Sequence, residues 1–217
     1  MEKVLLVGCG QHCGVILYNI EAQGRYEVVG LVDSDPAKCG KVFHGQPVLG
    51  DYSSDSLRKI REEYGVNRFF IAFGAMKYRR TVYEYMIAQG WEPVTIIHPD
   101  AVVSPKAKIG KGVLIECGCL ITPAPVIGDN VVVNTGSQVN HDNVVEDHVY
   151  IASGVVLSGG VRIRENTLLD DGVIVTMGTG VGKNCIVGAG SVVTKDLPDN
   201  VVAYGTPCRV IRENRYE

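Results

Sequence analysis

Residues 127–151 read IGDNVVVNTGSQVNHDNVVEDHVYI, and an aliphatic residue returns at every sixth position of this stretch. Continued in both directions, the same step meets Ile, Val or Leu at seventeen consecutive positions, from Ile97 to Val193. Small or β-branched residues often stand two positions earlier, as at Ala101, Ala107, Cys119, Ser137, Val149, Thr167 and Ser191. This hexapeptide repeat is typical of a parallel β-helix, in which each unit gives one short strand and buries one aliphatic side chain. At three units per coil, the repeat predicts about five coils.

The first 95 residues instead alternate strand-like and helix-like segments. Strands are predicted at 3–8, 27–33, 68–74 and 92–98, and helices that end at glycine at 14–24, 54–65 and 77–90. Such alternation predicts βαβ units with a parallel sheet. We therefore expect two domains: a Rossmann-like α/β domain over 1–95, and a β-helix over 96–217 whose end is capped by 197–213.

Composition narrows the class of protein. The net charge of −3 favours neither a nucleic-acid nor a membrane surface. No apolar run is long enough for a membrane span, and MEKVLLVGCG does not have the pattern of a signal peptide. Seven cysteines without C-x-x-C spacing favour buried thiols in a reducing compartment. We expect a cytoplasmic protein that binds neither nucleic acid nor a membrane.

His141 and Asp142 are the candidate catalytic pair. His141 follows the inward-facing Val139 by two positions, so it is expected at an accessible coil edge. A neutral imidazole can accept a proton, and an adjacent carboxylate can orient it. From the residues alone, an exposed turn histidine is more often one without a catalytic role. Cys119 is expected to point into the core rather than to act as a nucleophile.

A second motif, VLLVGCGQHCG (4–14), places Gly8-x-Gly10 between a strand and a helix. Such a loop presents backbone N–H groups and a helix N-terminus to a phosphate. Asp33, at the end of the second strand, could contact a ribose or base. The spacing leaves NAD(P) binding open, although Gly14 does not occupy the third position of G-x-G-x-x-G.

Three stretches, IHPDAVVSPKAKIG (97–110), VNTGSQVNHD (133–142) and VGAGSVVTKDLPDNVVAYGTPCRV (187–210), follow the βαβ domain. Together they resemble the NeuD/PglD-type sugar acetyltransferases over nearly the whole chain. The resemblance implies a left-handed β-helix, a homotrimer with active sites between subunits, acetyl-CoA as donor and no metal. It also implies N-acetylation of a nucleotide-linked amino sugar of the 4-amino-4,6-dideoxy type, for polysaccharide biosynthesis.

The resemblance also implies roles for individual residues. His141 is the general base and Asp142 its partner. Where the family has a second His, nine residues later, this chain has Tyr150, which can still donate a hydrogen bond to the thioester. Acetyl-CoA contacts are implied at Tyr150, Gly159, Asp171 and Gly180. Sugar-nucleotide contacts are implied at Gly8, Gly10, Gln11, His12, Asp33, Ser34, Asp35 and Gly74.

Departures from the family keep other functions open. Ala75 and Met76 replace two polar residues, and Lys77, Arg79 and Arg80 could compensate by contacting phosphate. O-acetylation of a sialic-acid-type sugar is the nearest alternative. A non-catalytic trimer that binds a nucleotide sugar is another. A zinc hydratase on the same solenoid is disfavoured, because it needs three His around one metal. Only His141 and His148 lie in the repeats, and His98 lies at their junction with the first domain.

Overall fold

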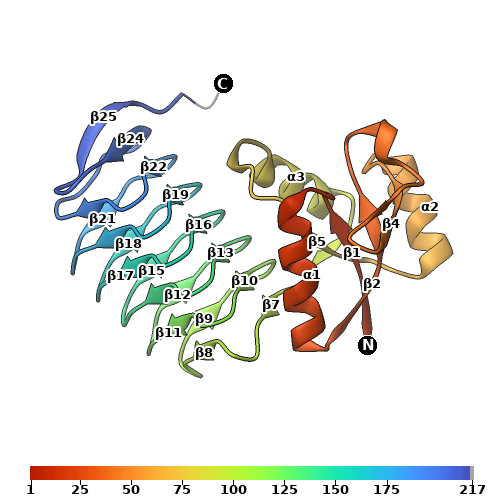
Figure 1. Cartoon of the computed structure of the whole chain (residues 1–217), viewed down its shortest axis with the longest axis horizontal. Helices are drawn as coiled ribbons and strands as arrows, with labels where there is room; N and C mark the ends of the chain where they lie inside the picture. Colours follow the sequence, from red (N-terminus) through yellow and green to blue (C-terminus); the bar gives the residue numbers. More distant parts are fainter. Residues whose placement is uncertain (216–217) are drawn as a thin grey trace. The chain divides into compact units, whose positions relative to one another are not determined.

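The computed structural model describes residues 1–215, which divide into two compact units, Met1–Ile96 and the residues from Ile97 onward. The first unit is built on a six-stranded sheet with the order β3-β4-β2-β1-β5-β6 (Figure 1). Its strands are β1 (Glu2–Val7), β2 (Tyr26–Val32), β3 (Val42–Phe43), β4 (Gln46–Gly50), β5 (Arg68–Ile71) and β6 (Glu92–Pro93). All pairs are parallel except β3 with β4.

Helices cover both faces of this sheet. They are α1 (Gln11–Gln23), α2 (Ser54–Tyr64) and α3 (Met76–Ala88), with a 3-10 turn, η1 (Pro36–Lys38), after β2. Leu57 of α2 and Met86 of α3 pack in one cluster with Leu5 and Val7 of β1. Helix α1 lies on the other face of the sheet (Figure 1), and its buried Ile16 does not belong to that cluster. The Rossmann-like prediction is confirmed.

Two parts of the first unit differ from the predicted elements. The predicted strand 92–98 is divided into β6 and β7 (Ile96–Ile97), and β7 belongs to a sheet of the solenoid. Pro93 lacks the N–H that a continuous strand needs, which confines β6 to the edge of its sheet. The hairpin β3–β4 and the η1 turn were not predicted at all.

The second unit is a left-handed parallel β-helix with three faces (Figure 1). One face contains β7, β10 (Leu114–Ile115), β13 (Val132–Val133), β16 (Tyr150–Ile151), β19 (Leu168–Leu169) and β22 (Ile186–Val187). The next contains β8 (Val102–Val103), β11 (Leu120–Ile121), β14 (Gln138–Val139), β17 (Val156–Leu157), β20 (Ile174–Val175) and β23 (Val192–Val193). The third contains β9 (Lys108–Ile109), β12 (Val126–Ile127), β15 (Val144–Val145), β18 (Arg162–Ile163) and β21 (Gly180–Val181).

Strand residues of successive coils pair eighteen positions apart, as Val132 does with Tyr150. One coil is therefore three hexapeptides long. All seventeen residues of the aliphatic ladder belong to the solenoid core or pack against it. Because full burial of each such side chain contributes roughly 1.5–3 kcal/mol, the ladder is the main stabilising feature of this unit. The β-helix prediction is confirmed.

Left-handed turn residues form columns along the edges of the solenoid. Asn130, His148, Asn166 and Asn184 all have φ between 54° and 61°. Asn166 Nδ2 donates to Asn184 Oδ1 at 2.9 Å, which ties successive coils together. After the last coil, β24 (Val201–Tyr204) pairs with β22 and forms an antiparallel hairpin with β25 (Arg209–Glu213). This hairpin lies within 197–213, the stretch in which a C-terminal cap is expected.

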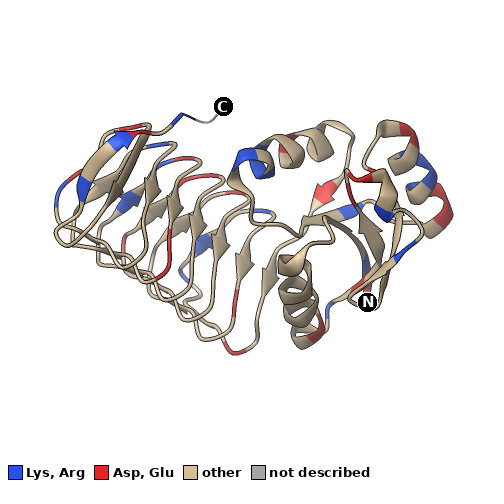
Figure 2. Cartoon of the chain, turned by 45° about the horizontal axis from the view of Figure 1, so that its top comes forward, with Lys and Arg blue, Asp and Glu red and all other residues tan. Residues whose placement is uncertain are grey.

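Charged residues of both signs are interspersed along the solenoid, whereas helix α1 is almost free of charge (Figure 2). Over residues 1–215, no helix has the length and apolar character needed to cross a membrane.

Candidate active site

His141 lies at the edge of the solenoid where the chain turns from β14 to β15. Its side chain is 59% exposed, as the sequence predicts for this position. Two asparagines brace the turn: Asn140 Nδ2 donates to Leu157 O at 2.7 Å, and the buried Asn143 accepts from Val161 N at 2.7 Å. The imidazole therefore projects from a turn that is fixed to the next coil.

Asp142 sits beside the ring. Its φ of 59° is the left-handed conformation that Asp tolerates better than most residues. In this conformation Asp142 Oδ2 lies 2.9 Å from His141 Nδ1. An ionised carboxylate only accepts hydrogen bonds, so the contact assigns the proton of a neutral imidazole to Nδ1. Nε2 then carries the free lone pair, as a general base requires.

Gly159 lies next to the ring, one coil further along the same edge. A β-carbon at position 159 would overlap Nε2 and Cε1 of His141. The backbone also links the two coils, since Gly160 N donates to His141 O at 2.9 Å. Sequence reasoning selected Gly159 for acetyl-CoA and missed its packing on the histidine. The eighteen-residue register was the signal that could have found it.

The other residues predicted to contact acetyl-CoA are dispersed over one chain. Gly180 begins β21, just after the edge that carries Gly159, and its N–H donates to Asp196. Tyr150 lies on β16, on a different face, where its hydroxyl accepts from Asn134 Nδ2 at 3.1 Å. Asp171 lies in the turn from β19 to β20, on another edge, and accepts from Ser153 N. A single chain thus brings only part of this set near His141.

Cys119 points into the solenoid core, as predicted. Burial raises the pKa of its thiol to about 11, which keeps it protonated and poorly nucleophilic at neutral pH. Across the described part of the chain, no group of three or more His, Cys, Asp or Glu is arranged to hold a metal ion.

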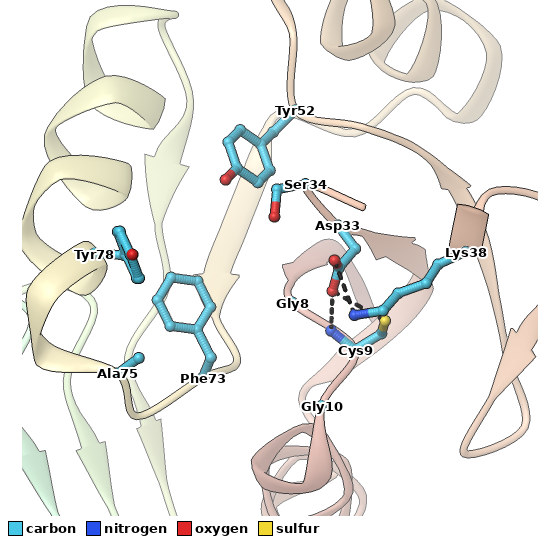
Figure 3. Close-up of a pocket in the computed structure, with 10 residues that line it drawn as sticks. All are labelled: Gly8, Cys9, Gly10, Asp33, Ser34, Lys38, Tyr52, Phe73, Ala75 and Tyr78. Carbon is cyan, nitrogen blue, oxygen red and sulfur yellow. Dashed lines mark hydrogen bonds and ion pairs between the residues drawn. The ribbon is translucent and has the colours of Figure 1, made fainter. Parts of the chain in front are cut away.

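The first unit contains a cavity of about 510 Å³ at the carboxyl ends of its central strands (Figure 3). Four of the eight residues predicted for substrate binding line it: Gly8, Gly10, Asp33 and Ser34. The other four, Gln11, His12, Asp35 and Gly74, are not among its lining residues, although Gly74 lies between two that are. Gly8 has a φ of 104°, and a β-carbon there would collide with the ring of Phe73. Glycine at position 8 therefore allows the end of β1 to lie directly against Phe73, which follows β5.

Asp33 occupies one side of this cavity and is already fully hydrogen-bonded. Oδ2 accepts from Cys9 N at 3.1 Å and from Cys9 Sγ at 3.0 Å. Oδ1 accepts from Asp35 N at 3.1 Å and from Lys38 Nζ at 3.0 Å. Although partial burial opposes ionisation, the hydrogen bonds from Cys9, Asp35 and Lys38 lower the pKa of Asp33. The carboxylate is therefore ionised at neutral pH.

Several lining residues were missed from the sequence. Tyr52, Phe73 and Tyr78 form the side of the cavity opposite Asp33 and Lys38 (Figure 3). Tyr52 and Tyr78 also line an adjoining cavity of about 530 Å³ that extends towards Tyr85. The sequence signal was weak, because each aromatic residue comes from a different loop or helix and none belongs to a recognisable motif.

The suggested phosphate contacts on α3 are not supported. Arg79 is 1% exposed, and its Nη1 donates to Ile71 O at 3.0 Å and Phe73 O at 2.9 Å. It fixes the end of β5 instead of facing solvent. Arg80 pairs with Glu84, and Lys77 lies over the ring of Tyr78.

His12, another residue predicted to bind the substrate, is neutral at pH 7. Burial, together with the charge of Arg79, lowers the pKa of its imidazole to about 4.

Known proteins match this chain in sequence and in fold. Residues 3–86 match the family model described as the PglD N-terminal domain. UDP-N-acetylbacillosamine N-acetyltransferase of Bacillus subtilis (strain 168) is 32% identical over 115 residues, which are 53% of this chain and 51% of that protein. The match thus spans about half the length of this curated relative.

Solved structures match over nearly their full length. GDP-perosamine N-acetyltransferase from Caulobacter crescentus, as a histidine-to-alanine variant in complex with CoA and GDP-perosamine, is 35% identical with a TM-score of 0.91. The alignment covers 98% of both chains. The acetyltransferase domain of PglB from Neisseria gonorrhoeae FA1090, in complex with acetyl coenzyme A, is 32% identical with a TM-score of 0.86, over 97% of this chain and 99% of that one. The chain belongs to the NeuD/PglD-type family of hexapeptide-repeat sugar acetyltransferases.

Proposed function

We propose that this protein transfers an acetyl group from acetyl-CoA to the amine of a nucleotide-linked sugar of the 4-amino-4,6-dideoxy type. The observation that carries the proposal is the 2.9 Å contact between His141 Nδ1 and Asp142 Oδ2 on an exposed, rigid edge. The relative that is complexed with CoA and GDP-perosamine supports both substrate classes.

The chemistry follows from the free lone pair on His141 Nε2. The neutral sugar amine attacks the thioester carbonyl carbon, and its proton passes to Nε2 as the N–C bond forms. Asp142 stabilises the resulting imidazolium through Nδ1. The C–S bond then breaks, and the imidazolium returns the proton to the CoA sulfur. No covalent enzyme intermediate is needed, and the core thiol of Cys119 takes no part.

The sugar nucleotide is assigned to the cavity of the first unit, whose volume of about 510 Å³ is within the range of small-molecule sites. Acetyl-CoA is assigned to Tyr150, Gly159, Asp171 and Gly180. Since these four residues are dispersed over one chain, their joint use requires neighbouring copies.

A homotrimer is supported by one apolar face of the solenoid. The outward residues of β8, β11 and β20 are Val102, Leu120 and Ile174, which are 64%, 39% and 40% exposed. Val156 and Val192 continue the stripe, half-buried. Gln138 of β14, between Leu120 and Val156, is the one polar residue of this row. An exposed row that is otherwise apolar favours contact with another protein surface, here a second and third copy of this chain. The free cysteines support a cytoplasmic location, where a product for polysaccharide biosynthesis is also expected to form.

The test is an acetyl-transfer assay with acetyl-CoA and GDP- or UDP-linked 4-amino-4,6-dideoxy sugars. Release of the CoA thiol and the mass of the acetylated sugar nucleotide are followed together. We expect His141→Ala to lower kcat by about 10²–10⁴-fold and Asp142→Asn, which tolerates the same φ, to lower it less. Asp100→Asn, at an exposed acid elsewhere on the solenoid, is the matched control.

Two results would contradict the proposal. If His141→Ala keeps full turnover, the base is assigned wrongly. If the protein binds the sugar nucleotide but releases no CoA thiol with any of these sugars, the non-catalytic alternative gains support. Acetylation of a hydroxyl, located by mass spectrometry after fragmentation, would move the assignment to O-acetylation.

A further inference from the structure

Lys38 stands out among the described residues that line the cavity, because it is the one cation there. It ends the η1 turn, five residues after Asp33, and its side chain is 30% exposed. Its Nζ lies 3.0 Å from Asp33 Oδ1. This bond to Asp33 raises the pKa of Lys38, so the ammonium group is charged at neutral pH.

Asp33 has little capacity left for a ligand. A carboxylate has about four lone-pair positions, and Asp33 already accepts from Cys9 N, Cys9 Sγ, Asp35 N and Lys38 Nζ. Its side chain is only 12% exposed. A ribose or base that sought an acceptor here would have to displace one of these donors. Lys38, by contrast, has three N–H donors. One is used on Asp33 and a second faces the Cys9 side chain, which leaves a donor for a ligand.

The surroundings of Lys38 favour an anion. Helix α1 begins at the same cavity, after Gly10, with no side-chain cap and no acidic residue in its first turn. Its first backbone N–H groups and its positive end add to the charge of Lys38. The opposite side of the cavity is aromatic, with Phe73, Tyr52 and Tyr78 suited to a planar base (Figure 3).

We propose that Lys38, rather than Asp33, binds the nucleotide in this cavity, through a phosphate oxygen, and that Asp33 is a positioning residue that holds Lys38 in place. The proposal rests on the assignment of the sugar nucleotide to this cavity. It concerns binding only, so it is tested without acetyl transfer.

The first experiment measures calorimetric binding of GDP, GMP and guanosine, and of UDP, UMP and uridine, to the full-length protein. We expect Lys38→Met to raise the Kd of the better-bound diphosphate by about 10- to 100-fold, the range typical of hydrogen bonds to charged groups. The Kd of the corresponding nucleoside should change less than about twofold. Lys38→Arg should retain most of the affinity. Lys41→Met, at an exposed lysine three residues away that does not line the cavity, is the matched control.

The second experiment is a double-mutant cycle. If Asp33 acts through Lys38, Asp33→Asn weakens diphosphate binding in the native background but adds nothing in the Lys38→Met background. If Asp33 contacts the ligand directly, the two effects multiply. Because Asp33 also anchors Cys9, thermal unfolding of both variants is recorded to show that they are folded at the assay temperature.

Three results would overturn the proposal: no change in diphosphate affinity on Lys38→Met, an equal loss for nucleoside and diphosphate, or multiplicative effects in the cycle. Failure of the unsubstituted protein to bind any of the six probes would overturn it as well. Diphosphate binding with the expected pattern, in a protein that transfers no acetyl group, would support Lys38 while refuting the proposed activity.

Discussion

Gly159 packs against the imidazole of His141, one full coil further along the solenoid, and leaves no space for a β-carbon between them. The pairing follows from the eighteen-residue register, which places position 159 directly beside position 141 on the same edge. The absence of a side chain at 159 therefore determines where the histidine ring can lie.

Gly159→Ala is expected to displace the His141 ring, because the added methyl group would overlap Nε2 and Cε1. We expect kcat to fall at least about tenfold through the misplaced base, whereas the free energy of unfolding should change by less than about 1 kcal/mol, because the exposed ring can rotate away. Steady-state kinetics and denaturant unfolding measure the two effects.

The control is the same substitution in a His141→Ala background, where the overlapping ring is gone. There Gly159→Ala should have almost no effect on stability. A clear loss of stability in both backgrounds would mean that the methyl group clashes with something other than the histidine.

Ile174 and Val175 are neighbours on β20 with opposite roles. Val175 is fully buried in the solenoid core, whereas Ile174 is 40% exposed on the apolar face. Val175→Ala should lower the free energy of unfolding by about 2 kcal/mol through lost burial and a small cavity, at constant protein concentration. Ile174→Lys should leave the fold intact and dissociate the proposed trimer, as measured by sedimentation velocity. A variant that stays trimeric would rule out this face as the contact between copies.

His12 should make stability depend on pH. Its pKa is lowered to about 4 in the folded protein, against about 6.5 for an unperturbed histidine. Between these values the unfolded chain binds a proton that the folded chain does not, so stability falls as the pH falls. The contribution is complete above about pH 6.5 and is lost by about pH 4, with an upper limit of about 3 kcal/mol.

Urea unfolding of the native protein and of His12→Gln, at several pH values from 4 to 7.5, isolates this contribution. The native protein should have the steeper decline in the acid range. Parallel profiles would show that His12 is protonated as readily in the folded protein as in the unfolded one.

The cysteines should differ sharply in reactivity. Cys39 is exposed, whereas Cys13 and Cys119 are buried, and burial raises the pKa of their thiols to about 12 and about 11. A brief treatment with N-ethylmaleimide at pH 7, followed by peptide mass spectrometry, should label Cys39 first. Cys13 and Cys119 should react only after unfolding. Rapid labelling of Cys119 in the native protein would place its thiol outside the core.

The solenoid was predictable because its coils repeat one local rule. Each ladder residue, such as Val139 or Leu157, is buried by neighbours that obey the same period, so no distant contact has to be guessed. The accessible position of His141 beside Asp142 followed from the same count.

The cavity was harder to predict because its contacts depend on tertiary structure. Asp33 was expected to meet a ligand, but its oxygens are used by Cys9, Asp35 and Lys38. The spacing of residues in a sequence does not reveal that all acceptor positions of a carboxylate are already used by hydrogen bonds within the protein. Arg79 likewise has the appearance of a surface residue on a charged helix, yet it is buried against the carbonyl groups of Ile71 and Phe73.

The eighteen-residue coil also restricts how this chain can change in length. Removing six residues upstream of His141 would keep every aliphatic side chain inward. Such a deletion would nevertheless shift every later residue by one face of the solenoid. His141 and Gly159 would then lie on a different edge relative to the coils that precede the deletion. Removing three residues would break the six-residue period, so the aliphatic side chains after the deletion would no longer align with those before it. Within the repeats upstream of His141, an insertion or deletion that keeps the hexapeptide pattern regular therefore preserves both the core and the edge of the histidine only when it removes or adds whole coils of eighteen residues.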